Sequence, residues 1–342
     1  MKLLVTGATG FLGSHLLPLL AEAGHALRIL ARGPAPGPAA LGAEVATAGL
    51  TDRDALRRAL EGVDAVYHLA GQVEFDPDDP AALYDLHVQG TRVLLEEAAA
   101  AGVGRVILAS SSGTIGLSRE ARVATEDDDY PLAVAAPWPY YLSKIFQEKA
   151  ALRIHRDTGL PLVVLNPSLL LGPGDERLGS TVVVWKFLQR RVPAIPGGGL
   201  SLVDVRDAAR AFAAALERGR PGERYLLGGH NLTFADLFGR LERLSGVSSP
   251  RLRLPPGVNV AGARLAERFH AWRGSESALD APSVEMGERF FYVDSAKAAR
   301  ELGFAPRDLQ ETLFDTVRFL EARFGRPAGP SWAATSPRPP RP

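Results

Sequence analysis

The feature that most constrains the fold is a glycine-rich turn directly after a short apolar segment at the N-terminus. Residues 2–6 are mostly apolar, and glycines follow at a spacing of three, at Gly7, Gly10 and Gly13. The chain then continues with a helical stretch and a second β-like segment, residues 12–23 and 26–30. This order predicts a strand–turn–helix–strand unit, and hence a parallel α/β sheet.

Such a turn binds an anion through its backbone. Glycine has no Cβ atom, so it adopts unusual φ values and lets a phosphate approach the main chain, while the helix that follows presents unpaired N–H groups. A glycine-rich turn by itself is also compatible with an ordinary strand-to-helix connection. We expect a pyrophosphate site whose contact residues are Gly7, Thr9, Gly10, Phe11, Leu12 and Gly13.

The end of the second expected strand indicates which dinucleotide binds. An acidic residue there typically accepts hydrogen bonds from the adenosine ribose of NAD, but this chain has Arg32, with Arg28 earlier on the same strand. A guanidinium pairs well with a phosphate, so both arginines favour NADP, with NAD still possible. The alternative is that Arg32 is a solvated charge before the Gly/Pro-rich loop of residues 33–38.

A Tyr-x-x-x-Lys pattern suggests proton transfer. Tyr140 and Lys144 are four residues apart and fall on one face of an expected helix. A tyrosine has an ordinary pKa of about 10, so it needs a nearby cation to act near neutral pH. Tyr141 lacks this partner because residue 145 is Ile145. We expect Tyr140 to be the acid/base and Lys144 to lower its pKa, the alternative being a tyrosine packed in the core.

Serines at the end of another strand complete the pattern. Ser110, Ser111 and Ser112 follow the β-like segment 105–109. Ligands of open α/β sheets bind at the carboxyl ends of the strands, so a hydroxyl there can hold a substrate oxygen beside the tyrosine. We assign this role to Ser111, although spacing alone does not exclude Ser112.

Together these motifs resemble the extended short-chain dehydrogenase/reductases, the NAD-dependent epimerase/dehydratase family. The resemblance is to the dihydroflavonol-reductase-like branch, near bacterial hopanoid-associated sugar epimerase-like proteins. Further matching segments are residues 68–71, 88–91, 166–174, 202–207 and 294–303. The resemblance implies a Rossmann-type doubly wound parallel sheet with a smaller, discontinuous C-terminal substrate cap. It also implies that Tyr140 and Lys144 contact the cofactor, as do Leu50, Leu69, Ala70, Gly71, Asn166, Pro167 and Ser168.

Two positions depart from the family pattern. His87 stands where the family usually has an asparagine, which leaves open the relay or helix role of that residue. Gly49 stands where the family usually has an acid, so we expect the backbone at Leu50 to hold the adenine.

The side chains of the segment 110–114 indicate the type of reaction. The segment 110–114 carries no carboxylate, whereas dehydratases of this family need an acid and a base there. We therefore predict an NADP-dependent oxidoreductase that reduces a ketone or aldehyde to an alcohol. The alternatives are an NAD-dependent nucleotide-sugar epimerase and a nucleotide-sensing protein without catalysis. Trp138, between two prolines, is expected at the entrance and favours an apolar substrate.

Composition excludes several other classes. The 39 basic and 39 acidic residues balance, which argues against nucleic-acid or membrane partners. The absence of cysteine excludes disulfides and thiolate chemistry and fits a cytoplasmic protein. The seven histidines lack ligand spacing, so no metal is expected. No apolar run approaches the roughly 20 residues of a membrane span.

The expected organisation is a cofactor-binding domain, a cap and a tail. The first comprises residues 1–172 with parts of 200–230, the second the discontinuous segment 173–325, and the third a disordered, proline-rich stretch at 326–342. Residues 255–272 are expected to form a helix of the cap core, the alternative being a helix that covers an oligomer surface. The expected helices 81–101 and 140–158 form the homodimer interface in relatives of the family, so a homodimer is implied by resemblance.

Overall fold

The computed structural model describes residues 1–74, 79–272 and 281–326. Its centre is a seven-stranded, all-parallel sheet with strand order β3-β2-β1-β4-β5-β6-β9. The order reverses direction beside β1, so the predicted doubly wound Rossmann-type sheet is confirmed. The strands in sheet order are Glu44–Thr47, Ala26–Ala31, Lys2–Thr6, Ala65–His68, Arg105–Ala109, Leu162–Pro167 and Arg224–Leu227.

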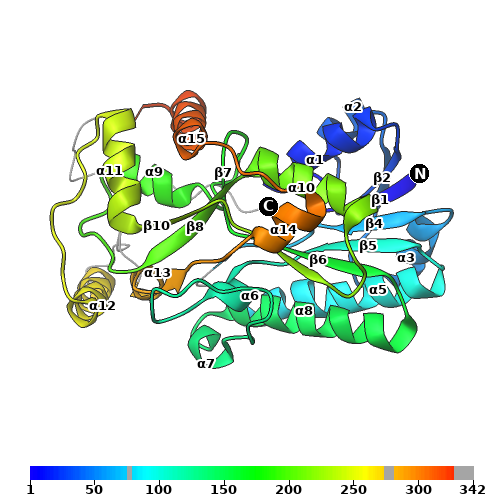
Figure 1. The fold of residues 1–342 in the computed structure, drawn as a ribbon, viewed down its shortest axis with the longest axis horizontal. Coiled ribbons are helices and arrows are strands. Elements are labelled where there is room, and N and C mark those ends of the chain that lie inside the picture. The colour runs from blue at the N-terminus through cyan, green and yellow to red at the C-terminus, as the bar shows by residue number, and fades with distance from the viewer. Residues whose placement is uncertain (75–78, 273–280, 327–342) are drawn as a thin grey trace.

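Helices cover both faces of this sheet (Figure 1). One face packs against α1 (Phe11–Glu22), α10 (Val205–Arg218) and α14 (Ala296–Leu302). The other face packs against α3 (Arg53–Leu60), α5 (Gly90–Ala100) and α8 (Pro139–Thr158). Strands β1, β4 and β6 are buried on both faces, which explains their nearly continuous apolar sequences.

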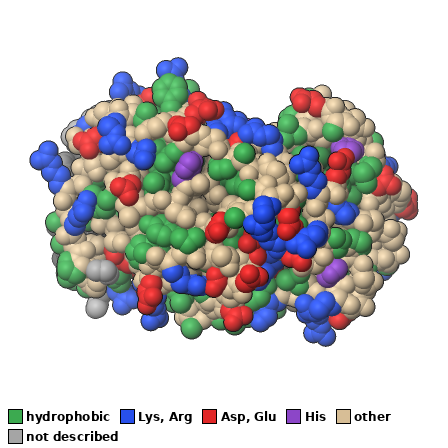
Figure 2. All heavy atoms as spheres, viewed as in Figure 1, with side chains coloured by type: hydrophobic (Ala, Val, Ile, Leu, Met, Phe, Trp, Pro, Cys, Tyr) green, Lys and Arg blue, Asp and Glu red, His purple; other side chains and the backbone are tan. Residues whose placement is uncertain are grey.

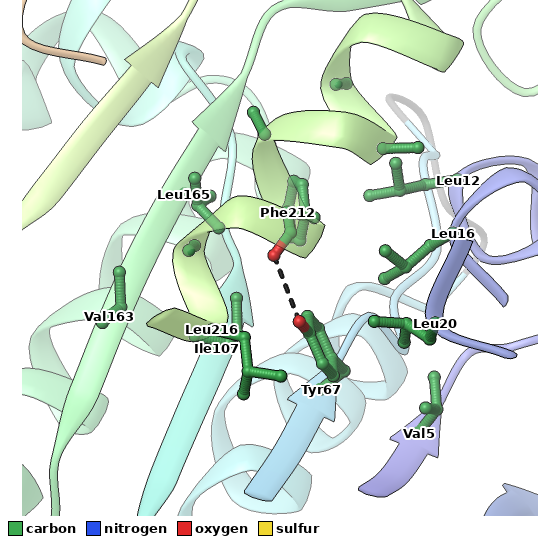
Figure 3. Close-up of a cluster of buried hydrophobic side chains, with 14 of the residues drawn as sticks. Val5, Leu12, Leu16, Leu20, Tyr67, Ile107, Val163, Leu165, Phe212 and Leu216 are labelled. Carbon is green, nitrogen blue, oxygen red and sulfur yellow. Dashed lines mark hydrogen bonds between the residues drawn. The ribbon is translucent and has the colours of Figure 1, made fainter. Parts of the chain in front are cut away.

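The core between α1, α10 and the sheet contains a buried polar link at Tyr67. The Tyr67 hydroxyl donates a hydrogen bond to the backbone carbonyl of Phe212 at 3.2 Å, among leucine side chains of α1 such as Leu16 and Leu20 (Figure 3). Tyr67 is fully buried on β4. Its ring therefore contributes apolar contact area while its hydroxyl keeps a partner.

A second, smaller sheet lies beside the carboxyl ends of the central strands (Figure 1). Its strand β8 pairs with β10, β11 and β7. The bounds are β7 Leu169–Leu171, β8 Gly199–Asp204, β10 His230–Thr233 and β11 Phe290–Phe291. Three helices bury apolar side chains against it, namely α9 Val182–Leu188, α11 Phe234–Ser245 and α15 Leu309–Phe324. Other helices are α2 Pro36–Ala40, α6 Gly113–Gly116, α7 Leu132–Ala135, α12 Pro256–Trp272 and α13 Ala281–Gly287.

Two local expectations need correction. The expected helix at 81–101 is interrupted: α4 (Pro80–Tyr84) leads into a π-helical turn η1 (Asp85–Gln89) before α5 begins. A π-turn holds one extra residue, a feature that sequence periodicity does not show. The loop expected at 33–38 contains the start of α2, where Pro36 occupies the first turn and its missing N–H costs nothing.

The surface carries charges of both signs. On the face drawn in Figure 2, basic and acidic side chains are interspersed and gather over α14, where Arg220 pairs with Glu301 and Lys297 with Glu223. Among the described residues, no helix is both long and apolar enough to cross a bilayer. The expected tail falls almost wholly at 327–342, outside the described residues.

Candidate active site

The glycine-rich turn packs its backbone so tightly that side chains are excluded. A Cβ atom on Gly7, whose φ is +70°, would lie 2.6 Å from the backbone nitrogen of Ala70. A Cβ atom on Gly13 would lie 2.6 Å from the carbonyl oxygens of Gly7 and Ala8. The turn closes with a hydrogen bond from the Gly10 N–H to the Gly7 carbonyl at 3.0 Å. These approaches explain why glycine occupies these positions.

The amino end of α1 presents backbone donors to an anion. Gly10 is its N-cap and no side chain caps the helix. Thr9 is exposed, Phe11 is half-buried, and Leu12 is buried in the core below. Uncapped N–H groups at a helix start, beside backbone that admits close approach, fit a pyrophosphate. The residues present therefore fit the dinucleotide that the sequence predicts.

The loop after β7 lies against the start of α1. The His15 Nε2 atom donates a hydrogen bond to the carbonyl of Pro173 at 2.8 Å. A Cβ atom on Gly174, whose φ is +101°, would lie 3.2 Å from the same nitrogen. Sequence reasoning missed His15, whose position on α1 gives no sign of a partner 158 residues away.

Arg32 and Arg28 play different parts. Arg28 is buried, and its Nη1 atom donates to the carbonyls of Ala59 at 2.7 Å and Glu61 at 3.1 Å at the end of α3. Its Nε atom lies 2.9 Å from Glu44 Oε2. The expectation that Arg28 pairs with a ribose phosphate was therefore wrong, since its donors neutralise the carboxyl end of a helix. Arg32 follows β2, is exposed, and has no hydrogen bond or ion pair with any other described residue.

The segment after β4 passes beside the expected catalytic helix. A Cβ atom on Gly71 would lie 3.3 Å from the Nζ atom of Lys144. Leu69 and Ala70 are half-buried, and the Ala70 N–H donates to the Thr6 hydroxyl at 3.2 Å. Leu50 packs against α5, because a Cβ atom added to Gly90 would lie 3.0 Å from the Cβ atom of Leu50. This segment therefore brings backbone groups close to the ammonium.

The structure separates the three serines by what their hydroxyls contact. Ser111 forms a side-chain hydrogen bond with Tyr140. Ser110 instead donates to the buried carboxylate of Glu148 at 2.6 Å. Ser112 is buried, and its backbone N–H donates to the Pro167 carbonyl at 3.0 Å. Ser111 is therefore the serine that the structure brings to Tyr140.

The two adjacent tyrosines also differ. Tyr140 is buried beside Ser111; burial raises its pKa to about 12, while the Ser111 hydrogen bond acts to lower it. The Tyr141 hydroxyl lies 3.6 Å from the Met286 sulfur. The ring of Tyr141 packs edge-on against Trp138, whose side chain is 1% exposed. The expectation that Trp138 forms the entrance was wrong, because it belongs to the buried wall behind Tyr141.

The Lys144 ammonium is buried and bonded inside the protein. Its Nζ atom donates to the backbone carbonyl of Ala109 at 3.1 Å and to Gln147 Oε1 at 2.9 Å. Burial lowers the pKa of Lys144 to about 8, opposed by the charge of Glu148. At neutral pH the ammonium form therefore dominates, but it loses its proton within reach of working pH.

His87 connects the segment after β4 to the catalytic helix. Its Nε2 atom accepts a hydrogen bond from the Gln72 backbone N–H at 3.0 Å, so Nδ1 carries the proton and donates to Ser143 Oγ at 2.8 Å. Ser143 in turn donates to the Tyr140 carbonyl at 2.8 Å. Burial, then Lys144 and His68, lower the pKa of His87 to about 2, so the imidazole stays neutral.

A second buried network was not anticipated from the sequence. Gln147 Nε2 donates to the Thr91 hydroxyl at 2.8 Å, and Thr91 meets His68 Nε2 at 2.8 Å. The other nitrogen of His68 lies 2.7 Å from the Thr6 hydroxyl. The only sequence signal was polar residues at positions that helix and strand periodicity assign to the core.

The segment from Asn166 to Ser168 lies at the end of β6. Asn166 Nδ2 donates to Glu148 Oε2 at 2.8 Å and to the Thr114 hydroxyl at 3.1 Å, whereas its buried Oδ1 has no hydrogen-bond partner. The Ser168 hydroxyl is buried without a partner as well. Polar atoms of this kind are rare unless a ligand or water completes them. Within the described chain, no three acidic or histidine side chains gather as a metal site.

Comparisons with known proteins agree with this geometry. The family model described as the NAD dependent epimerase/dehydratase family matches residues 3–228. A putative dihydroflavonol 4-reductase of Synechocystis sp. (strain ATCC 27184 / PCC 6803 / Kazusa) is 31% identical, and the match covers 93% of this chain and 94% of that one. Sterol demethylase protein B of Methylococcus capsulatus is 32% identical, with 94% and 99% covered.

Two solved structures extend the similarity to three dimensions. The crystal structure of gox2253 superposes with a TM-score of 0.82 at 33% identity, covering 95% of this chain and 99% of that one. PA4631, a nucleoside-diphosphate-sugar epimerase from Pseudomonas aeruginosa, gives 0.76 at 27% identity, covering 94% and 98%. The chain therefore belongs to the NAD-dependent epimerase/dehydratase family, the extended short-chain dehydrogenases/reductases, and is an NAD(P)-dependent enzyme of that type.

Proposed function

We propose that this enzyme reduces a ketone or aldehyde to an alcohol with NADPH. The observation that carries the proposal is the Ser111–Tyr140 hydrogen bond, with Lys144 one helical turn after Tyr140 on α8. The nearby carboxylate of Glu148 is not available as a dehydratase acid, since it accepts from Ser110, Thr114, Asn166 and Tyr130. A site with hydroxyls and an ammonium suits hydride transfer with one proton transfer.

The proposed mechanism gives each side chain one task. NADPH, when bound, supplies the hydride to the carbonyl carbon. The Tyr140 hydroxyl donates its proton to the carbonyl oxygen, and the Ser111 hydroxyl donates a hydrogen bond to the same oxygen. A pKa of about 12 keeps Tyr140 protonated at neutral pH, the form that reduction needs. The Lys144 charge stabilises the phenolate left behind.

Arg32 supports the choice of NADP. It is exposed at the end of β2, where an acidic residue would select NAD, and no described residue neutralises it. A ribose phosphate would pair with this free guanidinium. We further propose that the glycine turn, Leu50, Leu69–Gly71 and Asn166–Ser168 line the cofactor site, as the family resemblance implies.

The surroundings of Tyr140 support an apolar substrate body. Its ring belongs to a buried cluster with Leu83, Leu117, Tyr141 and Ile145. Met286 and Phe291 pack against this cluster from α13 and β11. We propose that the smaller sheet and its helices form the substrate cap, and that the substrate carries its carbonyl on an apolar skeleton.

The alternative is epimerisation of a nucleotide sugar, favoured by the similarity to PA4631. An epimerase first oxidises its substrate, so Tyr140 would begin as a phenolate. Burial opposes that form, since it raises the pKa of Tyr140 to about 12. Reduction starts from the protonated tyrosine and is therefore the better fit.

The proposal is tested with NADPH deuterated at the transferring position and a panel of aromatic and polycyclic ketones and aldehydes. We expect NADPH oxidation with one deuterium in each alcohol formed. A panel that gives no turnover, combined with interconversion of nucleotide sugars at catalytic NAD⁺, would replace reduction by epimerisation.

We also propose a cytoplasmic homodimer. Tyr84 and Phe146 lie on α4 and α8, are 42% and 39% exposed, and contact each other edge-on. Exposed aromatic side chains at this helix pair suit an interface, and the absence of cysteine suits a reducing compartment. Sedimentation should show that the native protein is a dimer and that Phe146→Asp dissociates more readily. A native protein that sediments as a monomer would contradict the proposal.

A further inference from the structure

Among the described residues, the Lys144 ammonium has one side-chain acceptor, Gln147. Gln147 is fully buried, three residues further along α8, and its Oε1 atom accepts from Lys144 Nζ at 2.9 Å. The Ala109 carbonyl accepts a second N–H at 3.1 Å. An ammonium has three donors, so these two bonds leave one for the reaction site.

The Gln147 amide is held in a single orientation. Its Nε2 atom donates to the Thr91 hydroxyl at 2.8 Å, so the amide cannot turn over without placing donors against the ammonium. Thr91 is fixed in turn by His68, and His68 by Thr6. The network thus runs from the catalytic helix to the residue before the glycine-rich turn. All four of these side chains are at most 1% exposed.

We propose that Gln147 is a positioning residue that holds the Lys144 ammonium in the active site through a neutral, buried acceptor. The proposal rests on the proposed function, in which the Lys144 charge stabilises the phenolate form of Tyr140. A neutral acceptor aligns the ammonium without cancelling its charge. A carboxylate at the same place would also align the ammonium, but its negative charge would raise the pKa of Lys144.

The charged and titratable groups around Lys144 are few among the described residues. Tyr140 and Glu148 lie one turn away on α8, His87 faces the lysine from η1, and His68 faces it from β4. Both imidazoles are neutral, because burial and then the lysine charge lower their pKa values to about 2 and about 3. The pKa of Lys144 is therefore set by burial, which lowers it, and by the charge of Glu148, which raises it, while Gln147 adds no charge.

The test follows Lys144 directly. The chain has five lysines, Lys2, Lys144, Lys149, Lys186 and Lys297, so ¹³Cε-lysine labelling gives few NMR signals, and Lys144→Met identifies the relevant one. We expect a midpoint near pH 8 in the native protein. Gln147→Glu should raise it by about one pH unit or more, and Gln147→Leu should lower it.

A matched control separates this effect from added charge in general. Gln89→Glu places the same new carboxylate at a half-buried position in a solvent-exposed contact with Arg92, and should leave the Lys144 midpoint unchanged. The signals of the other four lysines report whether each variant is folded. If Gln147→Leu does not fold, Gln147→Glu, which keeps the shape of the side chain, still decides the question.

NADPH binding, followed by fluorescence in the same variants, distinguishes two failures. We expect about a 10-fold or greater loss of affinity in Gln147→Leu, because the ammonium loses its orientation. A native protein that does not bind NADPH would overturn the proposed function while leaving the titration informative. A protein that binds NADPH normally, with the same Lys144 midpoint in both Gln147 variants, would overturn the positioning role.

Discussion

The imidazole of His87 accepts a hydrogen bond from the backbone N–H of Gln72 at 3.0 Å, which ties the segment after β4 to the helix that carries Tyr140. The other nitrogen reaches Ser143, one turn into that helix. The family usually has an asparagine at this position, whose shorter side chain has a different reach. Here the larger ring occupies a π-helical turn and stays neutral. We therefore assign to His87 the role of connecting the segment after β4 to the helix that carries Tyr140.

The buried imidazoles predict acid sensitivity. The pKa values of His68 and His87 are about 3 and about 2 in the folded protein, below the unfolded value of about 6.5. Their contribution is thus complete above pH 6.5 and is lost as the pH falls. Each histidine should remove about 2 kcal/mol of unfolding free energy between pH 7 and pH 5. Urea unfolding at pH 7 and pH 5 checks this. His87→Asn should lose about half as much unfolding free energy between these pH values as the two histidines lose in the native protein. The same loss in the variant and the native protein would contradict the prediction.

The adjacent tyrosines offer a matched pair of substitutions. Tyr140→Phe removes the proposed proton donor and should lower kcat about 100-fold or more, with NADPH binding retained. Tyr141→Phe removes only a hydroxyl 3.6 Å from the Met286 sulfur and should change kcat by less than about threefold. Steady-state kinetics on the best carbonyl substrate compares them. Similar losses in both variants would show that the effect is structural.

Arg28 on β2 and Arg32 just after it separate cofactor choice from stability. Arg32→Ala should weaken NADPH binding about 10-fold or more and leave NADH binding unchanged, since one charge-assisted contact is lost. Arg28→Met should leave the NADPH/NADH ratio unchanged but lower the unfolding free energy by about 1–3 kcal/mol, because the buried carbonyls after α3 lose their donor. Titration calorimetry and urea unfolding measure the two effects. The assignment of Arg32 is wrong if Arg32→Ala has the same ratio of NADPH to NADH affinity as the native protein.

The glycine turn predicts a strong positional effect. Gly13→Ala would place a methyl group 2.6 Å from two backbone oxygens, so the turn must open, and NADPH affinity should fall about 10-fold or more. Gly33→Ala has nothing within 4 Å of its Cβ and should change unfolding free energy by less than about 0.5 kcal/mol. Binding and melting experiments on both variants test this. Normal affinity in Gly13→Ala would argue against a pyrophosphate at the turn.

The sequence predicted what depends on local pattern. The parallel sheet, the start of α1 and the helix carrying Tyr140 and Lys144 all follow from glycine spacing, apolar periodicity and residue separation along one helix. The structure places the Ser111 hydroxyl against Tyr140 and the Ser110 hydroxyl on Glu148, and the catalytic role of Ser111 stays a prediction.

What the sequence did not predict depends on contacts between distant residues. Arg28 donates to the carbonyls of Ala59 and Glu61, and the Trp138 indole N–H donates to the Pro282 carbonyl at 3.4 Å, so both side chains are held by residues far along the chain. The π-turn at His87 and the network through Gln147 join strands and helices tens of residues apart. Periodicity marks such positions as buried but does not name their partners.

The central claim is that this protein exchanges NADPH in each turnover to reduce a carbonyl. The most direct measurement is the nucleotide released by denaturing freshly purified protein, followed by binding of NADPH and NADH to the native protein. We predict little retained nucleotide and clearly tighter binding of NADPH. Near-stoichiometric retained NAD⁺ would contradict both the NADP assignment and the reductase, because an epimerase regenerates its cofactor in place.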